Sequence, residues 1–292
     1  MWNWHFANAV EVNQRNEMLN FCKSENIHTI FLQISYDFKT AKNGQIICQL
    51  HHIKELRSFL TEAHNLNINI EALDGARYLA LPPWHPYVLS QVEALMQFNQ
   101  QGQSQEQFDG LHYDIEPYSL PEWQQGQKES ISLQYLTLIA RMGEKLRKSG
   151  SKMTLGLSIP FWFEEPGDDG IINVNLTWNK QVKALSYHLL DLVDEIAIMD
   201  YRTAAQGPNG AIRHAQDEVQ YADKVRKKVW VGLETGKVQG DPPSISFFGH
   251  PVSDLEKVST EITQAFQNNK SFQGIAIHYY EPYKALLEKQ GK

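Results

Sequence analysis

Two carboxylate residues stand two positions apart at the end of an apolar segment, residues 108–118, where Asp114 and Glu116 follow Tyr113 and Ile115 in alternation. Residues two apart in a β-strand point to the same face, so these two carboxylates face the same way, and His112 shares their face. A carboxylate beside another carboxylate in a closed site has its pKa raised. The pattern predicts Glu116 as a general acid at neutral pH, with Asp114 as its charged partner. The alternative is a strand end paired ionically with a residue such as Arg202.

Eight short apolar segments of this kind recur about every 40 residues, the length of one strand-helix unit of an eightfold barrel. The expected strands are 2–7, 29–35, 67–73, 110–116, 153–159, 195–201, 229–234 and 274–280. Helical periodicity is clear between several of them, at 52–64, 132–149, 221–227 and 254–268. The sequence therefore predicts an α/β protein with the (β/α)8 TIM-barrel fold, as a single domain over 1–292. The alternative is a doubly wound open sheet, for which no glycine-rich phosphate loop is found.

The catalytic residues of such a barrel lie at the carboxyl ends of its strands. Those ends give further candidates for contacts with the substrate, each with packing or ion pairing as its alternative: Glu71, His112, Trp162, Asp200, Arg202, Glu234 and Tyr280. An aromatic ring such as Trp162 offers a flat apolar face on which the C–H face of a sugar can stack. Glu234 is left open between a hydrogen-bond acceptor, a salt-bridge partner and a second catalytic carboxylate.

The segment 109–116 resembles the DGxDxDxE signature of family 18 glycoside hydrolases, the chitinase-like barrels. Asp109, Gly110, Asp114 and Glu116 match it, whereas His112 replaces an aspartate. In that family the glutamate is the general acid/base. The aspartate two positions before it orients the N-acetyl group of the substrate, which attacks the anomeric carbon. The resemblance implies these roles for Glu116 and Asp114.

A second match lies at 199–202, which is similar to the strand-6 segment of that family. The resemblance makes Tyr201 the catalytic tyrosine that contacts the reacting acetamido group, and Arg202 stands where the family has Asp or Asn. The strand-8 tryptophan of the family is absent from 277–280, so a tyrosine such as Tyr280 would have to form the floor of the sugar site. The resemblance implies a hydrolase of a poly- or oligosaccharide.

Two other enzyme classes and a binding protein stay open. Glu116, followed by Pro117, and Glu234 resemble the two glutamates of the large clan of retaining glycosidases, although Ile115 stands where that clan has asparagine. Retention needs carboxyl groups about 5–5.5 Å apart, and inversion needs about 6.5–9.5 Å. The substituted motif positions also fit a non-catalytic carbohydrate-binding barrel. A metal-dependent hydrolase or lyase is the third alternative.

The composition narrows the classes of partner. A formal net charge of -7 argues against nucleic acid and against anionic lipid surfaces. Two cysteines, Cys22 and Cys48, form neither a disulfide framework nor a zinc motif, so no metal and no cofactor is expected. No apolar stretch approaches the roughly 20 residues that cross a membrane, and no signal peptide is recognisable. We expect a carbohydrate substrate and a location in the cytoplasm, or outside it after removal of a signal; the sequence does not give the oligomeric state.

Overall fold

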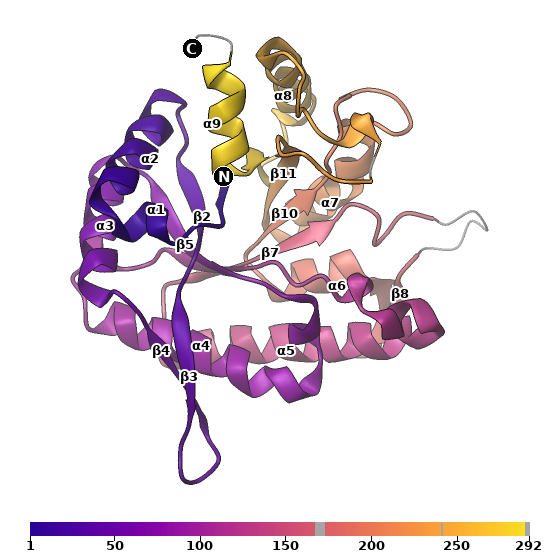
Figure 1. The fold of residues 1–292 in the computed structure, drawn as a ribbon. Helices are drawn as coiled ribbons and strands as arrows, with labels where there is room; N and C mark the ends of the chain where they lie inside the picture. Colours follow the sequence, from indigo (N-terminus) through magenta and orange to yellow (C-terminus); the bar gives the residue numbers. More distant parts are fainter. Residues whose placement is uncertain (167–172, 241, 290–292) are drawn as a thin grey trace. The chain divides into compact units, whose positions relative to one another are not determined.

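The computed structural model describes residues 1–166, 173–240 and 242–289. Eight parallel strands form its main sheet, in the order β1-β2-β5-β6-β7-β10-β11-β12, and helices follow them along the chain (Figure 1). This is the (β/α)8 TIM-barrel fold, as predicted. Every expected strand overlaps one of the eight: β1 (Trp2–Asn3), β2 (Thr29–Gln33), β5 (Asn69–Asp74), β6 (Gly110–Tyr113), β7 (Thr154–Pro160), β10 (Glu195–Met199), β11 (Lys228–Glu234) and β12 (Phe272–His278).

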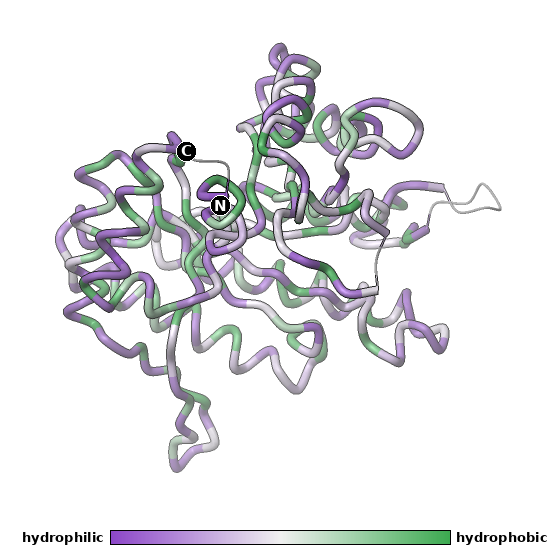
Figure 2. The backbone as a smooth tube through the Cα atoms, turned by 45° about the horizontal axis from the view of Figure 1, so that its top comes forward, coloured by the Kyte–Doolittle hydropathy of each residue, from purple (hydrophilic) through white to green (hydrophobic). Residues whose placement is uncertain are grey.

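Nine α-helices lie in the described ranges: α1 (Ala7–Val10), α2 (Val12–Ser24), α3 (Ile53–Asn65), α4 (His85–Gln100), α5 (Lys128–Ser149), α6 (Leu185–Leu192), α7 (Ala211–Val225), α8 (Val252–Phe266) and α9 (Tyr280–Glu288). Figure 2 shows hydrophobic and hydrophilic stretches alternating along the longer helices, the pattern of helices with one buried face. None of the helices in these ranges is both long and apolar enough to cross a bilayer.

Short elements follow the strands where loops would be expected. They are the 3-10 helices η1 (Arg77–Ala80), η2 (Pro82–Trp84), η3 (Ser104–Glu106), η4 (Pro117–Ser119) and η6 (Pro243–Ile245), the π-helical turn η5 (Trp123–Gln127), and two antiparallel hairpins, β3 (Tyr36–Thr40) with β4 (Ile46–Leu50) and β8 (Asn175–Trp178) with β9 (Gln181–Ala184). Proline occupies the first turn of η2 and of η4. The fixed φ of proline suits a first helical turn and favours the start of these two helices.

The chain divides into two compact units, which we describe separately. The N-terminal unit is Asn3–Gly156, and the C-terminal unit is Leu157–Lys292 together with Met1–Trp2. The prediction of one domain over 1–292 stays a prediction.

In the N-terminal unit, β2, β5 and β6 are fully covered, and their apolar residues form a core because a parallel sheet of this kind is buried on both faces. The register places Phe31 beside Glu71, and Glu71 beside Gly110, on one face of the sheet. Tyr113 lies on the opposite face, where its hydroxyl donates to Gln91 of α4. The first face therefore points away from the helices.

In the C-terminal unit, β10, β11 and β12 pair in parallel. The register sets Ala197 beside Trp230, and Glu234 beside His278. Because side chains alternate along a strand, Trp230 and Glu234 share one face, and Asp200 at the end of β10 turns to the other, toward α7. The side chains of the candidate residues Asp200 and Tyr201, which are neighbours in the chain, therefore point in different directions.

Candidate active site

The carboxylate pair lies just beyond β6. The strand ends at Tyr113, so the expected strand is three residues too long, and Asp114 and Glu116 belong to the turn that follows. The backbone N–H of Asp114 still donates to the carbonyl of Asp74 at 2.9 Å, which ties this turn to the end of β5. Glu116 directly precedes η4, and its carbonyl accepts the N–H of Ser119 at 3.1 Å. Both backbone positions are thus fixed by hydrogen bonds.

Asp114 sits in an environment that favours its neutral form. Burial, and then the negative charge of Glu116, raise its pKa to about 8. Its Oδ1 is buried and has no hydrogen-bond partner among the residues that the structure describes. Behind it lies Tyr135 of α5, whose own pKa is raised by burial and by the Asp114 charge. These surroundings favour the neutral form of Asp114 over the charged partner that the spacing predicted.

Glu116 is half-buried, and the hydroxyl of Tyr118 donates a hydrogen bond to its Oε1. A donor at this oxygen fixes the rotamer of the carboxyl group and leaves Oε2 as the oxygen that can present a proton. The sequence analysis did not single out Tyr118, although it stands only two residues after Glu116. An aromatic residue so close to a candidate acid is the signal that could have identified it.

A close contact of two turns supports the pair. A Cβ atom added to Gly75 would lie 2.1 Å from the carbonyl oxygen of Asp114, so only glycine fits there. The preceding residue, Asp74, accepts hydrogen bonds from the hydroxyl of Tyr36 and, at 2.6 Å, from Nε2 of Gln91. These contacts hold the end of β5 against the turn that carries the carboxylates.

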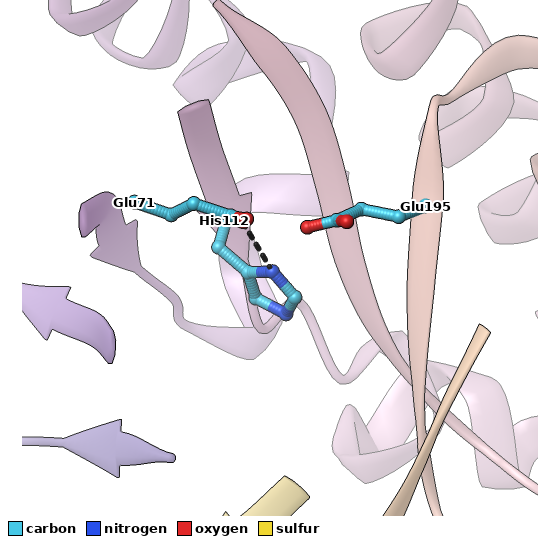
Figure 3. Close-up of side chains that lie close together, drawn as sticks. All are labelled: Glu71, His112 and Glu195. Carbon is cyan, nitrogen blue, oxygen red and sulfur yellow. Dashed lines mark hydrogen bonds and ion pairs between the residues drawn. The ribbon is translucent and has the colours of Figure 1, made fainter. Parts of the chain in front are cut away.

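Glu71 and His112 form a buried pair within the sheet of the N-terminal unit. Nδ1 of His112 lies 3.2 Å from Oε2 of Glu71 (Figure 3). The imidazole stacks on Phe31 with ring centroids 3.8 Å apart. His112 has no exposed surface, and Glu71 has 5%. The histidine that replaces the aspartate of the family motif is thus held by Glu71 and Phe31.

Asp109 and Gly110, the first two residues of the family motif, have structural roles. The carboxylate of Asp109 accepts the N–H of Ile70 at 2.7 Å and lies 3.0 Å from Nε2 of His64, whose pKa it raises. A Cβ atom on Gly110 would meet the Thr154 hydroxyl at 2.2 Å. Asp109 and Gly110 therefore fasten the start of β6 to its neighbours, at the end opposite the carboxylate pair.

In the C-terminal unit, the structure brings Tyr201 and Glu234 together through His278. Nδ1 of His278 donates to Oε2 of Glu234 at 2.6 Å, and the Gly236 N–H donates to Oε1 at 2.5 Å. The rings of Tyr201 and His278 stack with centroids 5.4 Å apart. Trp2 meets the same imidazole edge-on. His278, which was not among the predicted site residues, is the centre of this group.

Asp200 and Arg202 belong to a separate group under α7. Asp200 has no exposed surface, and its Oδ1 lies 2.7 Å from Nδ1 of His214. Burial raises the pKa of Asp200, whereas burial and then Arg202 lower that of His214 to about 4. The Arg202 guanidinium lies over the ring of Phe161, which stacks on His214. Direct contact between Asp200 and a ligand would require α7 to move.

The remaining candidates of this unit are aromatic, and one further buried carboxylate, Glu195, was not predicted. Trp162 is half-buried and packs edge-on against Phe163. Tyr280 is only 4% exposed and begins α9 rather than ending a strand. Glu195 on β10, also drawn in Figure 3, accepts a hydrogen bond from the indole of Trp230 at 3.4 Å.

No protein-family model and no curated protein matches the sequence. Among solved structures, a GH18 chitinase from Pseudoalteromonas aurantia is similar with a TM-score of 0.53 at 12% identity, over 93% of this chain and 95% of that one. The xylanase and alpha-amylase inhibitor protein from Scadoxus multiflorus gives a TM-score of 0.49 at 15% identity, over 89% of this chain and 86% of its own.

A chitinase from Chromobacterium violaceum is similar with a TM-score of 0.45 at 15% identity, over 75% of this chain. The chain spans 64% of the length of that chitinase. Identities this low concern the fold and not the activity. At the level of the fold, the resemblance to chitinase-like barrels that the sequence predicted is confirmed.

Proposed function

We propose that the protein is a glycoside hydrolase that cleaves a poly- or oligosaccharide, with Glu116 as general acid/base. The observation that carries this proposal is the carboxylate pair after β6, where burial and the charge of Glu116 raise the pKa of Asp114 to about 8. Asp114, which holds a proton at neutral pH, lies two residues before Glu116 in the same turn, and a neighbouring group of this kind can serve a general acid. The chitinase-like fold supports the same assignment.

In the proposed reaction, Glu116 donates a proton to the glycosidic oxygen as the bond from that oxygen to the anomeric carbon breaks. The departing sugar leaves as an alcohol. By the resemblance, the acetamido oxygen of the substrate attacks the anomeric carbon, while Asp114 holds the acetamido N–H. Glu116, now a carboxylate, then takes a proton from the water that opens this intermediate, which restores the pair to its starting state.

The other assignments follow from the surroundings of each side chain. Tyr201, stacked on His278, is assigned by resemblance to contact the acetamido group. Trp162 and Arg202 are proposed to border the sugar site. Both oxygens of Glu234 are already hydrogen-bonded within the C-terminal unit, which favours a positioning role for this residue over that of a nucleophile. Glu71 and His112 bond to one another, and Asp200 and Tyr280 are buried, so we propose supporting roles for these four residues and no direct contact with the substrate.

The decisive experiment replaces Glu116 by Gln and measures turnover of chromogenic oligosaccharides of N-acetylglucosamine, glucose and xylose. General acid catalysis contributes about 10²–10⁴-fold, so turnover should fall at least that far while thermal unfolding stays unchanged. Glu122→Gln, at an exposed position five residues beyond Pro117, is the matched control and should retain full turnover. Full activity of the Glu116→Gln variant would refute the assignment.

A carbohydrate-binding protein without activity is the second candidate, and one observation favours it. His112 stands where the family motif has an aspartate, and it is buried in contacts with Glu71 and Phe31. This alternative predicts that calorimetry detects binding of an oligosaccharide, that no product forms, and that Glu116→Gln binds as the parent does.

A further inference from the structure

A serine, a histidine and an aspartate lie in contact at the open end of the hairpin of β3 and β4, in the N-terminal unit (Figure 1). Oγ of Ser35 lies 3.1 Å from Nδ1 of His51, and Nε2 of the same imidazole lies 2.9 Å from Oδ2 of Asp37. A nucleophile within hydrogen-bond reach of a base, which a third group orients, is the arrangement of a catalytic triad. None of these three residues was predicted as a site residue.

The pairing of the hairpin brings the three side chains to one face. Tyr36 pairs with Leu50 in the antiparallel register. Ser35 and His51 therefore stand opposite each other, and the N–H of His51 donates to the carbonyl of Ser35 at 3.0 Å. Asp37 comes two residues after Ser35 and shares its face, because side chains alternate along a strand. The contact of the three groups thus depends on the register of the hairpin.

The two contacts of His51 decide which of its ring nitrogens is basic. A carboxylate only accepts hydrogen bonds, so Nε2 carries the hydrogen that it donates to Asp37. In the neutral ring, Nδ1 then has the lone pair and accepts the hydroxyl hydrogen of Ser35. The two nitrogens exchange the positions that they have in serine proteases, but the carboxylate still fixes the tautomer and the other nitrogen still faces the serine.

The group lies at the end of the barrel strands where catalytic residues are found, and a ligand can reach it. Ser35 comes two residues after the carboxyl end of β2, and the hydroxyl of Tyr36 donates to Asp74 at the end of β5. Ser35 and His51 are half-buried, and Asp37 is exposed. Within the described ranges the N–H of Ser35 donates to no backbone carbonyl, which leaves it to bind the oxygen that becomes negative in acyl transfer.

We propose that Ser35, His51 and Asp37 form a second catalytic site, which hydrolyses short-chain carboxylic esters through an acyl-serine. Nδ1 of His51 takes the hydroxyl proton of Ser35 as Oγ bonds to the carbonyl carbon, and passes it to the alcohol oxygen as the ester bond breaks. A water molecule then gives a proton to Nδ1 while its oxygen bonds to the acyl carbon. The carboxylic acid leaves, and Oγ of Ser35 regains that proton.

The surroundings of Ser35 narrow the class of substrate. The side chains of His51 and Asp37 are polar and open to solvent, so a long apolar acyl chain would gain little burial beside them. An ester suits a site of this kind better than an amide does, because an alcohol leaves more readily than an amine. The inference does not depend on the role proposed for Glu116.

The first test measures hydrolysis of p-nitrophenyl acetate. The parent should exceed the rate of its urea-unfolded chain, which contains the same imidazoles. Ser35→Ala and His51→Asn should each lower the excess about 10²-fold or more, the least that acid–base catalysis contributes. Asp37→Asn should lower it about tenfold, because the ring loses a charged acceptor. His52→Asn is the matched control and should keep the parent rate, since His52 is exposed and asparagine tolerates its φ of 51°.

The second test separates a nucleophilic serine from a hydrogen-bonded hairpin. A fluorophosphonate probe bonds to an activated serine with loss of fluoride, and peptide mass spectrometry locates the label. We expect label on Ser35 in the parent and in His52→Asn, with labelling slowed about tenfold or more in His51→Asn. The proposal is overturned if Ser35 stays unlabelled in the parent, if Ser35→Ala or His51→Asn hydrolyses the ester as the parent does, or if His52→Asn loses as much activity as His51→Asn.

Discussion

Two pairs of carboxyl groups, one in each unit, contain a group whose pKa is raised by burial, and the pairs differ in access. Burial raises the pKa of both Glu164 and Glu218 in the C-terminal unit, that of Glu164 to about 7, and each of the two carboxyl groups affects the pKa of the other. Glu164 is 6% exposed, and Glu218 has no exposed surface. Asp114, whose pKa is raised to about 8, and Glu116 in the N-terminal unit are instead half-buried.

The comparison teaches that a raised pKa alone does not identify a catalytic acid. Desolvation produces the shift in both places, since it disfavours the charged form wherever a carboxyl group is buried. Only the pair after β6 combines the shift with a surface that a ligand could reach. The buried pair shares its proton internally, between the loop after β7 and α7. Access and the pKa together make the functional assignment.

The largest effect that separates the two pairs should come from Asp114→Asn. This change removes the partner that orients the acetamido group, and we expect kcat to fall by about 10²-fold or more. It also removes the carboxyl group whose pKa is raised to about 8. In the parent, Asp114 loses its proton near that pH, so activity should decline above it. In the variant this group is absent, so the alkaline limb of the pH–rate profile should no longer lie near pH 8.

The profile of kcat/KM against pH between 5 and 10 measures this shift. Asn preserves the shape of Asp, so unfolding temperatures of parent and variant should agree at pH 7. An alkaline limb that stays in place in Asp114→Asn would show that Asp114 is not the group that sets it.

A smaller effect is expected from Gly75→Ala, which tests whether the contact of the two turns positions the pair. The added methyl group would overlap the carbonyl of Asp114, and such overpacking costs about 1–3 kcal/mol. Because the displaced residue is Asp114, activity should fall together with stability.

The control is Gly150→Ala. Gly150 ends α5 at a φ of 70°, with no atom near its missing side chain. The change should therefore cost about 1 kcal/mol of stability and leave activity intact. The test measures denaturant unfolding and turnover of both variants. Equal losses of activity in the two variants would contradict a positioning role for Gly75.

The sequence predicted the strands well because their apolar runs are local signals. It placed the end of β6 three residues too late, since Asp114 and Glu116 extend the alternation of the strand although Pro117 already begins η4. The hairpin of β3 and β4 was not predicted, and among the residues of its two strands only Cys48 is buried. The predicted helix 221–227 covers only the last part of α7, whose first turns are largely polar.

The parts of the candidate site that depend on residues close in the sequence could be predicted. The parts that depend on contacts between distant segments could be predicted less well. The carboxylate pair needed only the spacing of Asp114 and Glu116. The bond between His278 and Glu234 and the bond between His214 and Asp200 join residues 44 and 14 positions apart, so they depend on strand register and on the docking of α7.

The smallest effect on activity is expected from Glu218→Gln, which acts on the buried pair. The folded pKa of Glu164 lies above its ordinary value, so the folded protein binds more protons than the unfolded chain between pH 4.5 and about 7. Stability is therefore greatest below this window and falls as the pH rises through it. We expect the parent to lose on the order of 2–3 kcal/mol between pH 5 and pH 8 from this pair.

In Glu218→Gln, the amide can donate to the Glu164 carboxylate, which removes the need for a shared proton. The variant should therefore lose less stability than the parent over the same pH range, with turnover changed less than twofold at the pH optimum. Urea unfolding at pH 5 and pH 8 measures the difference, with Glu122→Gln as a control that follows the parent. If Glu218→Gln instead abolishes turnover while remaining folded, the buried pair takes part in catalysis, and the distinction by access between the two pairs is wrong.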